Sequence, residues 1–466
     1  MMQTGAGKST ERLVILKPSD WSPQLVVLCV FFAVLFITGG SSRYDVPHLV
    51  VLRPLAICVL GFALATINAG AWRTYRPAIL LFASAFALTA LHLIPLPPHI
   101  WQALPGRQII ADIDAMAGLK DIWRPLTMFP EGTWNAFYAL TVPLAALLLA
   151  AQLNQRDVVR LLVWVTALSL VTGLVGVLQA AGSGIGLYHL DPGNAGLFAN
   201  RNHQAVMLAC LFPMLGALAM SASRFSISAR AVLIVSAAVT IMLIPLILVT
   251  GSRMGMVIAV LAFIYTGTIS LWQVVGQRRH AYYSLTLLAA GLATAVAMVL
   301  VTIYTARDEA IDRLDTADED LRWQFWESVV AFLPQYLPWG SGVGSFVPVY
   351  QIHEPDGMLM PQYVNQAHND WLDLALTSGV PGMILAAIAV AAFARAMGAA
   401  LVAPGVTGHI RRAGIGTILV LAFASLSDYP LRTPILAAVL AVAVIWAWAP
   451  LRPNENEESK GPYAQA

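Results

Sequence analysis

Residues 231–250 read AVLIVSAAVTIMLIPLILVT and contain no charged side chain. An α-helix needs about 20 mostly apolar residues to cross the hydrocarbon core of a bilayer. The stretch therefore predicts a membrane-spanning helix. A tight turn at Gly251–Gly255 follows it, and a second uncharged apolar run extends over residues 254–272. Together the two runs predict two successive membrane spans.

Similar runs recur along the chain, and about 12 of them are candidates to span a bilayer. Hydrophobic residues make up 58% of the 466 residues and charged residues only 11%, whereas soluble proteins carry about 25% charged residues. We therefore predict an all-α, polytopic integral membrane protein. The predicted spans cover residues 25–39, 49–67, 78–95, 133–153, 158–181, 203–220, 231–250, 254–272, 283–304, 371–397, 414–427 and 434–448.

The distribution of Lys and Arg predicts which side of the membrane each loop faces. If the N-terminus is cytoplasmic, sixteen Lys and Arg residues fall in short cytoplasmic segments and ten in longer outer segments. Since cytoplasmic loops are enriched in these residues, we predict cytoplasmic tails at 1–20 and 453–466 around a transmembrane domain at 21–452. Long outer loops, where sites are commonly built, are predicted at 96–132, 183–202 and 304–370, the largest before the tenth span.

Some short patterns suggest chemistry but have simpler explanations. Gly5–Thr10 ends like a phosphate-binding loop, yet Met2 stands where that motif requires its first glycine. A basic cytoplasmic tail explains the segment better. The cysteines lack the spacing of metal ligands or paired thiols, and we interpret them as small core residues: Cys29, Cys58 and Cys210.

The acidic stretch at Asp318–Asp320 matches a pattern by which many sugar-nucleotide enzymes hold a divalent metal. The preferred interpretation is the solvated flank of a helix, because an amphipathic stripe follows at once. With Trp323, Trp326 and Trp339 nearby, we expect this helix to lie along the outer membrane–water interface. The stripe consists of Leu321, Phe325, Val329, Phe332 and Leu333.

Two polar segments at the predicted outer face carry arginines. Arg253 lies in the turn at Gly251–Gly255, and Asn200, Arg201 and His203 lie in the segment 196–204, just before a span. Charges at membrane depth are usually functional, and a guanidinium suits phosphate. Donors at a helix N-terminus also form anion sites. The alternatives are a snorkelling arginine in the first case and an ordinary helix cap in the second.

The segment 365–373 closes the longest outer loop and contains a histidine beside carboxylates. His368 can act as a base near neutral pH, and Asp370 or Asp373 could orient it. The alternative is an interfacial capping cluster at the start of the next helix.

The turn at 427–434 joins the last two predicted spans and contains Asp428 and Arg432. It is either part of a site at the outer face or a structural turn. In the structural alternative, an Asp428–Arg432 pair and the neighbouring prolines hold the chain in a tight bend.

Taken in order, five segments resemble the O-antigen ligase and Wzy-type polymerase superfamily of bacterial membrane glycosyltransferases, over residues 130–440. The order of the segments and the large outer loop ahead of the histidine both fit that family. The segments are GLFANRNHQA (196–205), TGSRMG (250–255), LRWQFWESVVAFLPQYLPWGSGVGSF (321–346), AHNDWLDLALTSGVPG (367–382) and SLSDYPLRTP (425–434).

This resemblance implies transfer or polymerisation of glycan from an undecaprenyl-pyrophosphate carrier at the periplasmic face of the bacterial inner membrane. It implies no nucleotide sugar, metal, cofactor or nucleic acid. The acceptor would be a glycan, lipid A-core or protein. His368 would be the base, with Arg201, Arg253 and Arg322 binding the pyrophosphate. The residues expected to support them are Asn200, His203, Asn369, Asp370, Asp428 and Arg432.

Several related activities share this donor site: ligase, repeat-unit polymerase and protein O-oligosaccharyltransferase. A transporter of lipid-linked glycan is the alternative from another class. Ion-coupled carriers tend to place ionisable residues or broken helices near the midplane. Here the centres of the predicted spans carry almost no charge, which favours catalysis at one face.

Overall fold

The computed structural model describes residues 18–188, 194–224, 228–275, 322–359 and 363–448. The predicted span at 283–304, the motifs at 5–10 and 318–320 and nearly all of both predicted tails lie outside these ranges.

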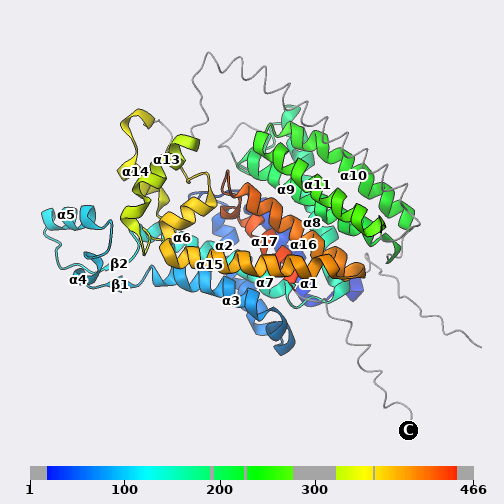
Figure 1. Cartoon of the computed structure of the whole chain (residues 1–466), viewed down its shortest axis with the longest axis horizontal. Helices are drawn as coiled ribbons and strands as arrows, with labels where there is room; N and C mark the ends of the chain where they lie inside the picture. Colours follow the sequence, from blue (N-terminus) through cyan, green and yellow to red (C-terminus); the bar gives the residue numbers. More distant parts are fainter. Residues whose placement is uncertain (1–17, 189–193, 225–227, 276–321, 360–362, 449–466) are drawn as a thin grey trace, which may run out of the picture.

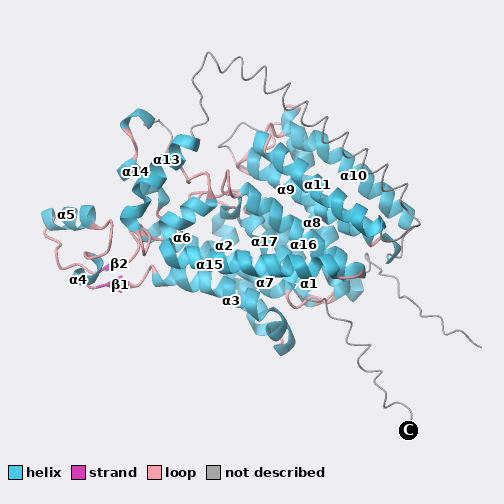
Figure 2. Ribbon diagram, in the orientation of Figure 1, coloured by secondary structure: helices cyan, strands magenta, loops and turns pink. Residues whose placement is uncertain are grey.

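Helices dominate the described chain (Figures 1 and 2), as the apolar runs predict. Within the described residues, eight segments are long and apolar enough to cross a membrane, namely α2, α3, α6 with α7, α8, α9, α10, α11 and α15. The protein is therefore a polytopic, all-α membrane protein. The main helices are α1 (Pro23–Thr38), α2 (Leu49–Thr66), α3 (Ala69–Leu91), α6 (Pro130–Ala139), α7 (Thr141–Ala150), α8 (Gln155–Ala180), α9 (Arg201–Met220), α10 (Ala229–Val249), α11 (Arg253–Val275), α15 (Asp370–Val402), α16 (Gly405–Ala424) and α17 (Pro434–Trp448).

Each predicted span within the described ranges coincides with a helical segment, although some boundaries differ. Helix α3 begins at Ala69, well before the predicted start at residue 78. Its first turns contain Arg73 and Arg76, which interrupt the apolar run without interrupting the helix. The side chain of Asn68 caps α3 by accepting a hydrogen bond from the Ala71 amide at 2.7 Å. Hydropathy missed this start because capping is a polar signal.

Helix α9 is the centre of the bundle, and the bundle packs around it. Of its apolar window 83% is buried, and α8, α10, α11 and α16 all contact it. Gly255 permits the close approach of α11, because a Cβ there would lie 2.2 Å from the Cβ of Ala205. Small residues at helix contacts are typical of membrane bundles.

The predicted core role of the cysteines holds for two of the three. Cys29 and Cys210 are buried, whereas Cys58 is exposed. Cys58 lies on α2, of whose apolar window only 28% is buried within the protein. An apolar residue on such a helix can face lipid, so its hydropathy does not report burial in the core.

A group of shorter elements lies beyond one end of the bundle (Figure 1). Strands β1 (Pro95–Leu96) and β2 (Arg124–Pro125) pair antiparallel around α4 (Pro98–Trp101) and α5 (Gln108–Met116). Arg107 fastens this arm to a later segment, donating to the carbonyls of Pro105 and Leu126 at 2.7 Å and of Gly340 at 2.8 Å. The remaining elements are α13 (Arg322–Phe332), η3 (Leu333–Tyr336), α14 (Phe346–His353) and η4 (Asp356–Met358).

The amphipathic stripe of α13 exists, but protein covers it. Phe325, Val329 and Phe332 are at most 5% exposed and join α14 residues such as Tyr350 in a second small core. Trp323 remains 69% exposed. Protein therefore covers the apolar face of α13 at these three residues, since an apolar face signals burial without identifying what buries it.

Helix α15 is broken at Gly379, where φ is +59°. A Cβ at this position would lie 2.2 Å from the Pro338 carbonyl oxygen, so glycine is required both by conformation and by space. The amide of Val380 donates to that same carbonyl at 2.8 Å, and the amide of Ser341 donates to the Leu376 carbonyl at 3.0 Å. The segment after η3 thus docks into the break in α15.

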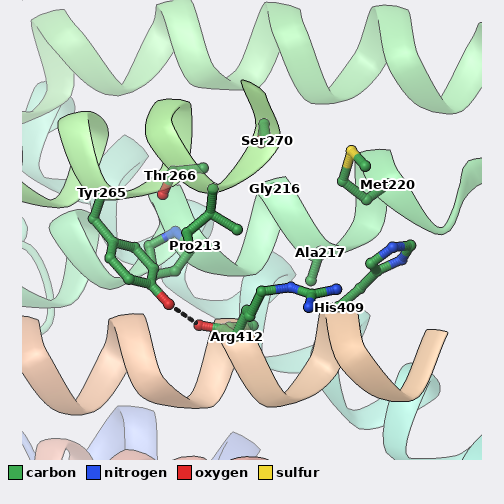
Figure 3. A pocket seen from close by; sticks show the side chains of 11 residues that line it. Pro213, Gly216, Ala217, Met220, Tyr265, Thr266, Ser270, His409 and Arg412 are labelled. Carbon is green, nitrogen blue, oxygen red and sulfur yellow. Dashed lines mark hydrogen bonds between the residues drawn. The ribbon is translucent and has the colours of Figure 1, made fainter. Parts of the chain in front are cut away.

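A cavity of about 20 Å³ lies between α9, α11 and α16 (Figure 3). The hydroxyl of Tyr265 donates to the backbone carbonyl of Arg412 there, at 2.8 Å. The Arg412 guanidinium donates to the carbonyls of Ala400 and Ala403 at 2.9 and 3.0 Å, which satisfies the C-terminus of α15. A space of this size holds about one water molecule, so it is structural and too small for a glycan.

Candidate active site

The N-terminal ends of four helices meet at one end of the bundle. Arg201 begins α9, Arg253 begins α11, Asp370 begins α15 and Pro434 begins α17. Side-chain hydrogen bonds described below join these ends to one another and to the turn between α16 and α17. Because a helix N-terminus carries a partial positive charge, this end of the bundle is suited to an anion.

His368 occupies a constrained backbone position immediately before α15. Its φ is +49°, and among the described residues it is the only one other than glycine whose φ is positive. Such conformations cost about 1–3 kcal/mol and persist where the surroundings fix them. The indole of Trp326 donates to the Ala367 carbonyl at 3.0 Å. Asn369 caps α15 by accepting from the amides of Trp371 and Leu372 at 3.0 and 3.1 Å, so the capping alternative holds for this residue.

The ring of His368 is held by groups from three other segments. Its Nδ1 lies 3.5 Å from Oδ1 of Asp428. The ring stacks on Phe325 of α13, with centroids 6.2 Å apart, and meets the edge of Tyr429 at 5.0 Å. The side chain is nevertheless 26% exposed. The imidazole is therefore oriented by protein on one side and accessible on another.

The carboxylate beside His368 is thus Asp428, and neither Asp370 nor Asp373 takes that place. Both lie within α15, beyond the turn made by His368 and Asn369, and both contact Arg432. The sequence placed them near His368 along the chain, but proximity along the chain does not determine where a helix directs its side chains.

Asp428 is 3% exposed and connects several elements. Its Oδ2 accepts a hydrogen bond from Nδ2 of Asn202 at 2.8 Å, and its Oδ1 lies 4.0 Å from Nε2 of His203. Burial alone would raise the pKa of Asp428, but the contact with His368 and the charges of His203, His368 and Arg322 outweigh it, so the pKa lies well below its ordinary value. Asp428 is therefore ionised near neutral pH.

Asn202 links Asp428 to the arginine-bearing turn. Its Oδ1 accepts from Oγ of Ser252 at 2.7 Å, and the same Ser252 oxygen accepts from the Gly255 amide at 3.0 Å. Asn200 caps α9 by accepting from the Asn202 amide at 2.8 Å. Sequence reasoning named Asn200 and missed Asn202 and Ser252, because their roles depend on a contact between separate segments. The available signal was their position inside the two polar segments.

His203 lies inside the bundle. It is 1% exposed, and its Nδ1 shares a 2.7 Å hydrogen bond with Oγ1 of Thr433 at the start of α17. Its ring meets Tyr429 edge-on at 5.2 Å. His203 thus joins α9 to the turn before α17, and its ring contacts the same Tyr429 as the ring of His368.

Arg432 forms a clamp between the last turn and α15. Its Nη2 donates to Asp373 at 2.8 Å and its Nε lies 3.4 Å from Asp370. Asp370 also accepts from Oγ of Ser425 at 2.9 Å. The alternative of an Asp428–Arg432 pair is wrong, because these two side chains have different partners on different elements.

Replacing Arg432 with alanine should destabilise the protein by about 3 kcal/mol, because it leaves Asp370 and Asp373 without their cation. Thermal unfolding in detergent measures the effect. Arg43→Ala is the matched control, since Arg43 pairs with the exposed carboxylate of Asp45 and such pairs contribute at most about 1 kcal/mol. Equal melting temperatures for the two variants would rule out the clamp.

The three predicted arginines come from α9, α11 and α13. Nη1 of Arg201 lies 3.6 Å from the position of a Cβ on Gly251, so it overlies the turn that leads into Arg253. Both side chains are exposed. Arg322 is half-buried, and its charge acts on Asp428 and Tyr429. Arg201 therefore lies beside the turn that contains Ser252, and Arg322 lies near Asp428.

Comparison with known proteins is consistent with this geometry. Residues 237–387 match the model of a family described as O-antigen ligase. That stretch includes Arg253, Arg322 and His368 and runs from α10 past the break in α15. No curated protein matches the chain significantly. The match over residues 237–387 supports the resemblance to the O-antigen ligase and Wzy-type polymerase superfamily.

Proposed function

We propose that this protein transfers or polymerises glycan from an undecaprenyl-pyrophosphate-linked donor at the periplasmic face of the bacterial inner membrane. The acceptor is a glycan, lipid A-core or a protein. One observation carries the proposal: the accessible His368, paired with the buried Asp428 at 3.5 Å, lies where helix N-termini meet and arginines gather. The family match over residues 237–387 supports glycan transfer.

His368 is assigned the role of general base. Its Nδ1 faces Asp428, which leaves Nε2 to take the proton from an acceptor sugar hydroxyl as that oxygen bonds to the anomeric carbon. A positioned base of this kind contributes about 10²–10⁴-fold in rate. The ionised Asp428 stabilises the imidazolium that results, so the proton transfer is balanced by a charge already present.

Arg201, Arg253 and Arg322 are assigned to the pyrophosphate. As the bond between the anomeric carbon and the pyrophosphate oxygen breaks, negative charge grows on the leaving undecaprenyl pyrophosphate. Fixed guanidinium groups stabilise that charge electrostatically. The N-termini of α9 and α11, where two of the arginines reside, add backbone donors to the same anion.

The location of the charges favours catalysis over transport. The polar network gathers at helix ends, whereas carriers bind their substrates near the midplane. Arg53, which lies within α2, donates to the side chain of Asn135 on α6 and so has a local partner. A flippase for lipid-linked glycan is the alternative, and glycan transfer by the purified protein from a lipid-linked donor would exclude it.

The function is tested by deleting the gene in its host and analysing surface and carrier-linked glycans on gels. We expect loss of the mature glycan and its restoration by the wild-type gene. Full-length polymer on the carrier identifies a ligase, single repeat units a polymerase, and loss of glycan from protein a protein O-oligosaccharyltransferase. Unchanged surface glycan without any accumulated precursor would contradict the proposal.

Asn202→Ala should lower transfer about tenfold, because it removes one hydrogen bond to the charged Asp428. Asn202→Asp should in addition shift the acidic limb of the pH–rate profile to higher pH, because an added negative charge favours protonation of its neighbours. A purely structural role would not move that limb.

The matched control is Asn194→Ala, because Asn194 also bonds across the bundle, to the Val249 carbonyl at 3.0 Å. Activity is compared at equal protein level in the membrane. If both alanine variants lose activity equally and the pH profile of Asn202→Asp matches the wild type, Asn202 has no positioning role.

A further inference from the structure

An open cavity of about 540 Å³ runs along one side of α13 and is bordered by η3, the end of α14 and η4. Its volume falls within the range of about 300–1,000 Å³ that is typical of ligand pockets. The described residues that matter for its chemistry are Gln324, Glu327, Ser328, Gln335, His353 and Met358.

The cavity lies along the helix that contacts the proposed base. Residues 324, 327, 328 and 331 recur at spacings of three and four, so they line one side of α13. The neighbouring side of the same helix contains Phe325, whose ring stacks on His368. At a rise of about 1.5 Å per residue, the strip extends about 10 Å from Gln324 to Ala331. The cavity and the ring of His368 thus lie on adjoining sides of α13.

One wall of the cavity is rigid. The His353 ring stacks on Phe332 with centroids 4.4 Å apart and an interplanar angle of 14°, and its Nε2 shares a 2.8 Å hydrogen bond with the Tyr336 hydroxyl. Tyr336 is packed against Gly106, where a Cβ would approach its ring to 2.5 Å. An imidazole fixed in this way loses little freedom when it binds a ligand.

The lining suits hydroxyl groups better than anions. Burial lowers the pKa of His353, so its imidazole is neutral at pH 7. The described lining residues contain no Arg or Lys, one carboxylate in Glu327 and two amides in Gln324 and Gln335. Amides and a carboxylate offer both donors and acceptors, as a ligand rich in hydroxyl groups requires. A phosphate would instead meet an uncompensated negative charge.

We propose that this cavity, the α13 groove, binds sugar residues of the glycan at a distance from the bond that is formed. The inference rests on the proposed function, because it assigns the groove to the same substrates. Both the donor chain and an acceptor glycan carry the required chemistry. The groove thus determines how many sugar residues beyond the reacting one the protein binds.

The first experiment measures binding without turnover. The full-length protein in lipid nanodiscs is titrated calorimetrically with the host's own surface glycan, released from its lipid by mild acid. The test variant combines Glu327→Gln with Gln335→Ala, both exposed positions whose replacement leaves the second core intact. The control is Gln351→Ala, an exposed glutamine of α14 outside the cavity lining.

We expect the double variant to bind the glycan about tenfold more weakly than the wild type. The reason is that it removes the charged carboxylate of Glu327 and the amide of Gln335 as hydrogen-bond partners of the sugar hydroxyls. Gln351→Ala should match the wild type, and all three proteins should elute identically on size exclusion. Equal affinity in all three, or binding of an acceptor-protein peptide with no binding of the glycan, would overturn the inference.

A second measurement shows whether sugars of the donor or of the acceptor occupy the α13 groove. It also tests the groove separately from the proposed function. In steady-state transfer assays, the double variant should have a higher KM than the wild type for the substrate whose sugars occupy the groove. That substrate is either the acceptor or a donor with several repeat units. Wild-type protein that binds glycan but performs no transfer would reject the proposed function alone. Normal transfer, with the double variant matching the control in affinity and in both KM values, would reject the groove alone.

Discussion

Replacing His368 with asparagine should reduce glycan transfer by about 10²–10⁴-fold, the contribution of a general base. Asparagine is chosen because it tolerates the positive φ of +49° that this position imposes, whereas most residues do not. The variant should therefore fold and reach the membrane while lacking a group that accepts a proton. Complementation of the deleted host, with protein quantified in membranes, measures the loss.

The control for this substitution is His99→Asn, an exposed histidine of α4 far along the chain from the site. It should restore the glycan fully. If His368→Asn restored it equally well, the assignment of a base to this position would be wrong, and the transporter alternative would then explain the membrane architecture better.

Replacing Arg253 with alanine should lower transfer by about 10²–10³-fold, which is the cost of removing one group that stabilises developing negative charge. Arg253→Lys should recover only part of the activity, because an ammonium group cannot bind phosphate oxygens in the bidentate geometry of a guanidinium. The measurement is transfer by purified protein from a lipid-linked donor, with products separated on gels.

Arg230→Ala serves as the matched control. Arg230 is exposed at the start of α10, at the opposite end of the same helix pair from Arg253, so its loss changes the net charge equally. It should leave transfer unchanged. Equal losses in both variants would mean that Arg253 acts through general charge or stability and has no specific role toward the pyrophosphate.

Most of the bundle is predictable because the signal for a membrane helix is local. The apolar runs at 231–250 and 254–272 correspond to α10 and α11, whose bounds differ from the prediction by a few residues. Hydropathy fails where the signal is polar or comes from elsewhere in the chain. The early start of α3 depends on the cap at Asn68, and the break at Gly379 depends on the docking of the segment around Pro338.

The candidate site likewise has features that the sequence predicts and features that depend on helix packing. The sequence alone identified the segments that carry polar groups and predicted that they lie at one face, because each segment adjoins the end of an apolar run. It also singled out His368, Arg201 and Arg253 by residue type and position. These predictions depend on the alternation of apolar spans and polar loops, which hydropathy along the sequence shows directly.

Partner choice within the site came from the packing of the helices. His368 faces Asp428, while Asp370, closer along the chain, turns to Arg432. Asn202 bridges Asp428 to Ser252 because α9 packs against both α11 and α16. Such pairings depend on how helices distant in sequence are set against one another, and a side chain's partner is fixed by that arrangement rather than by its neighbours in the chain.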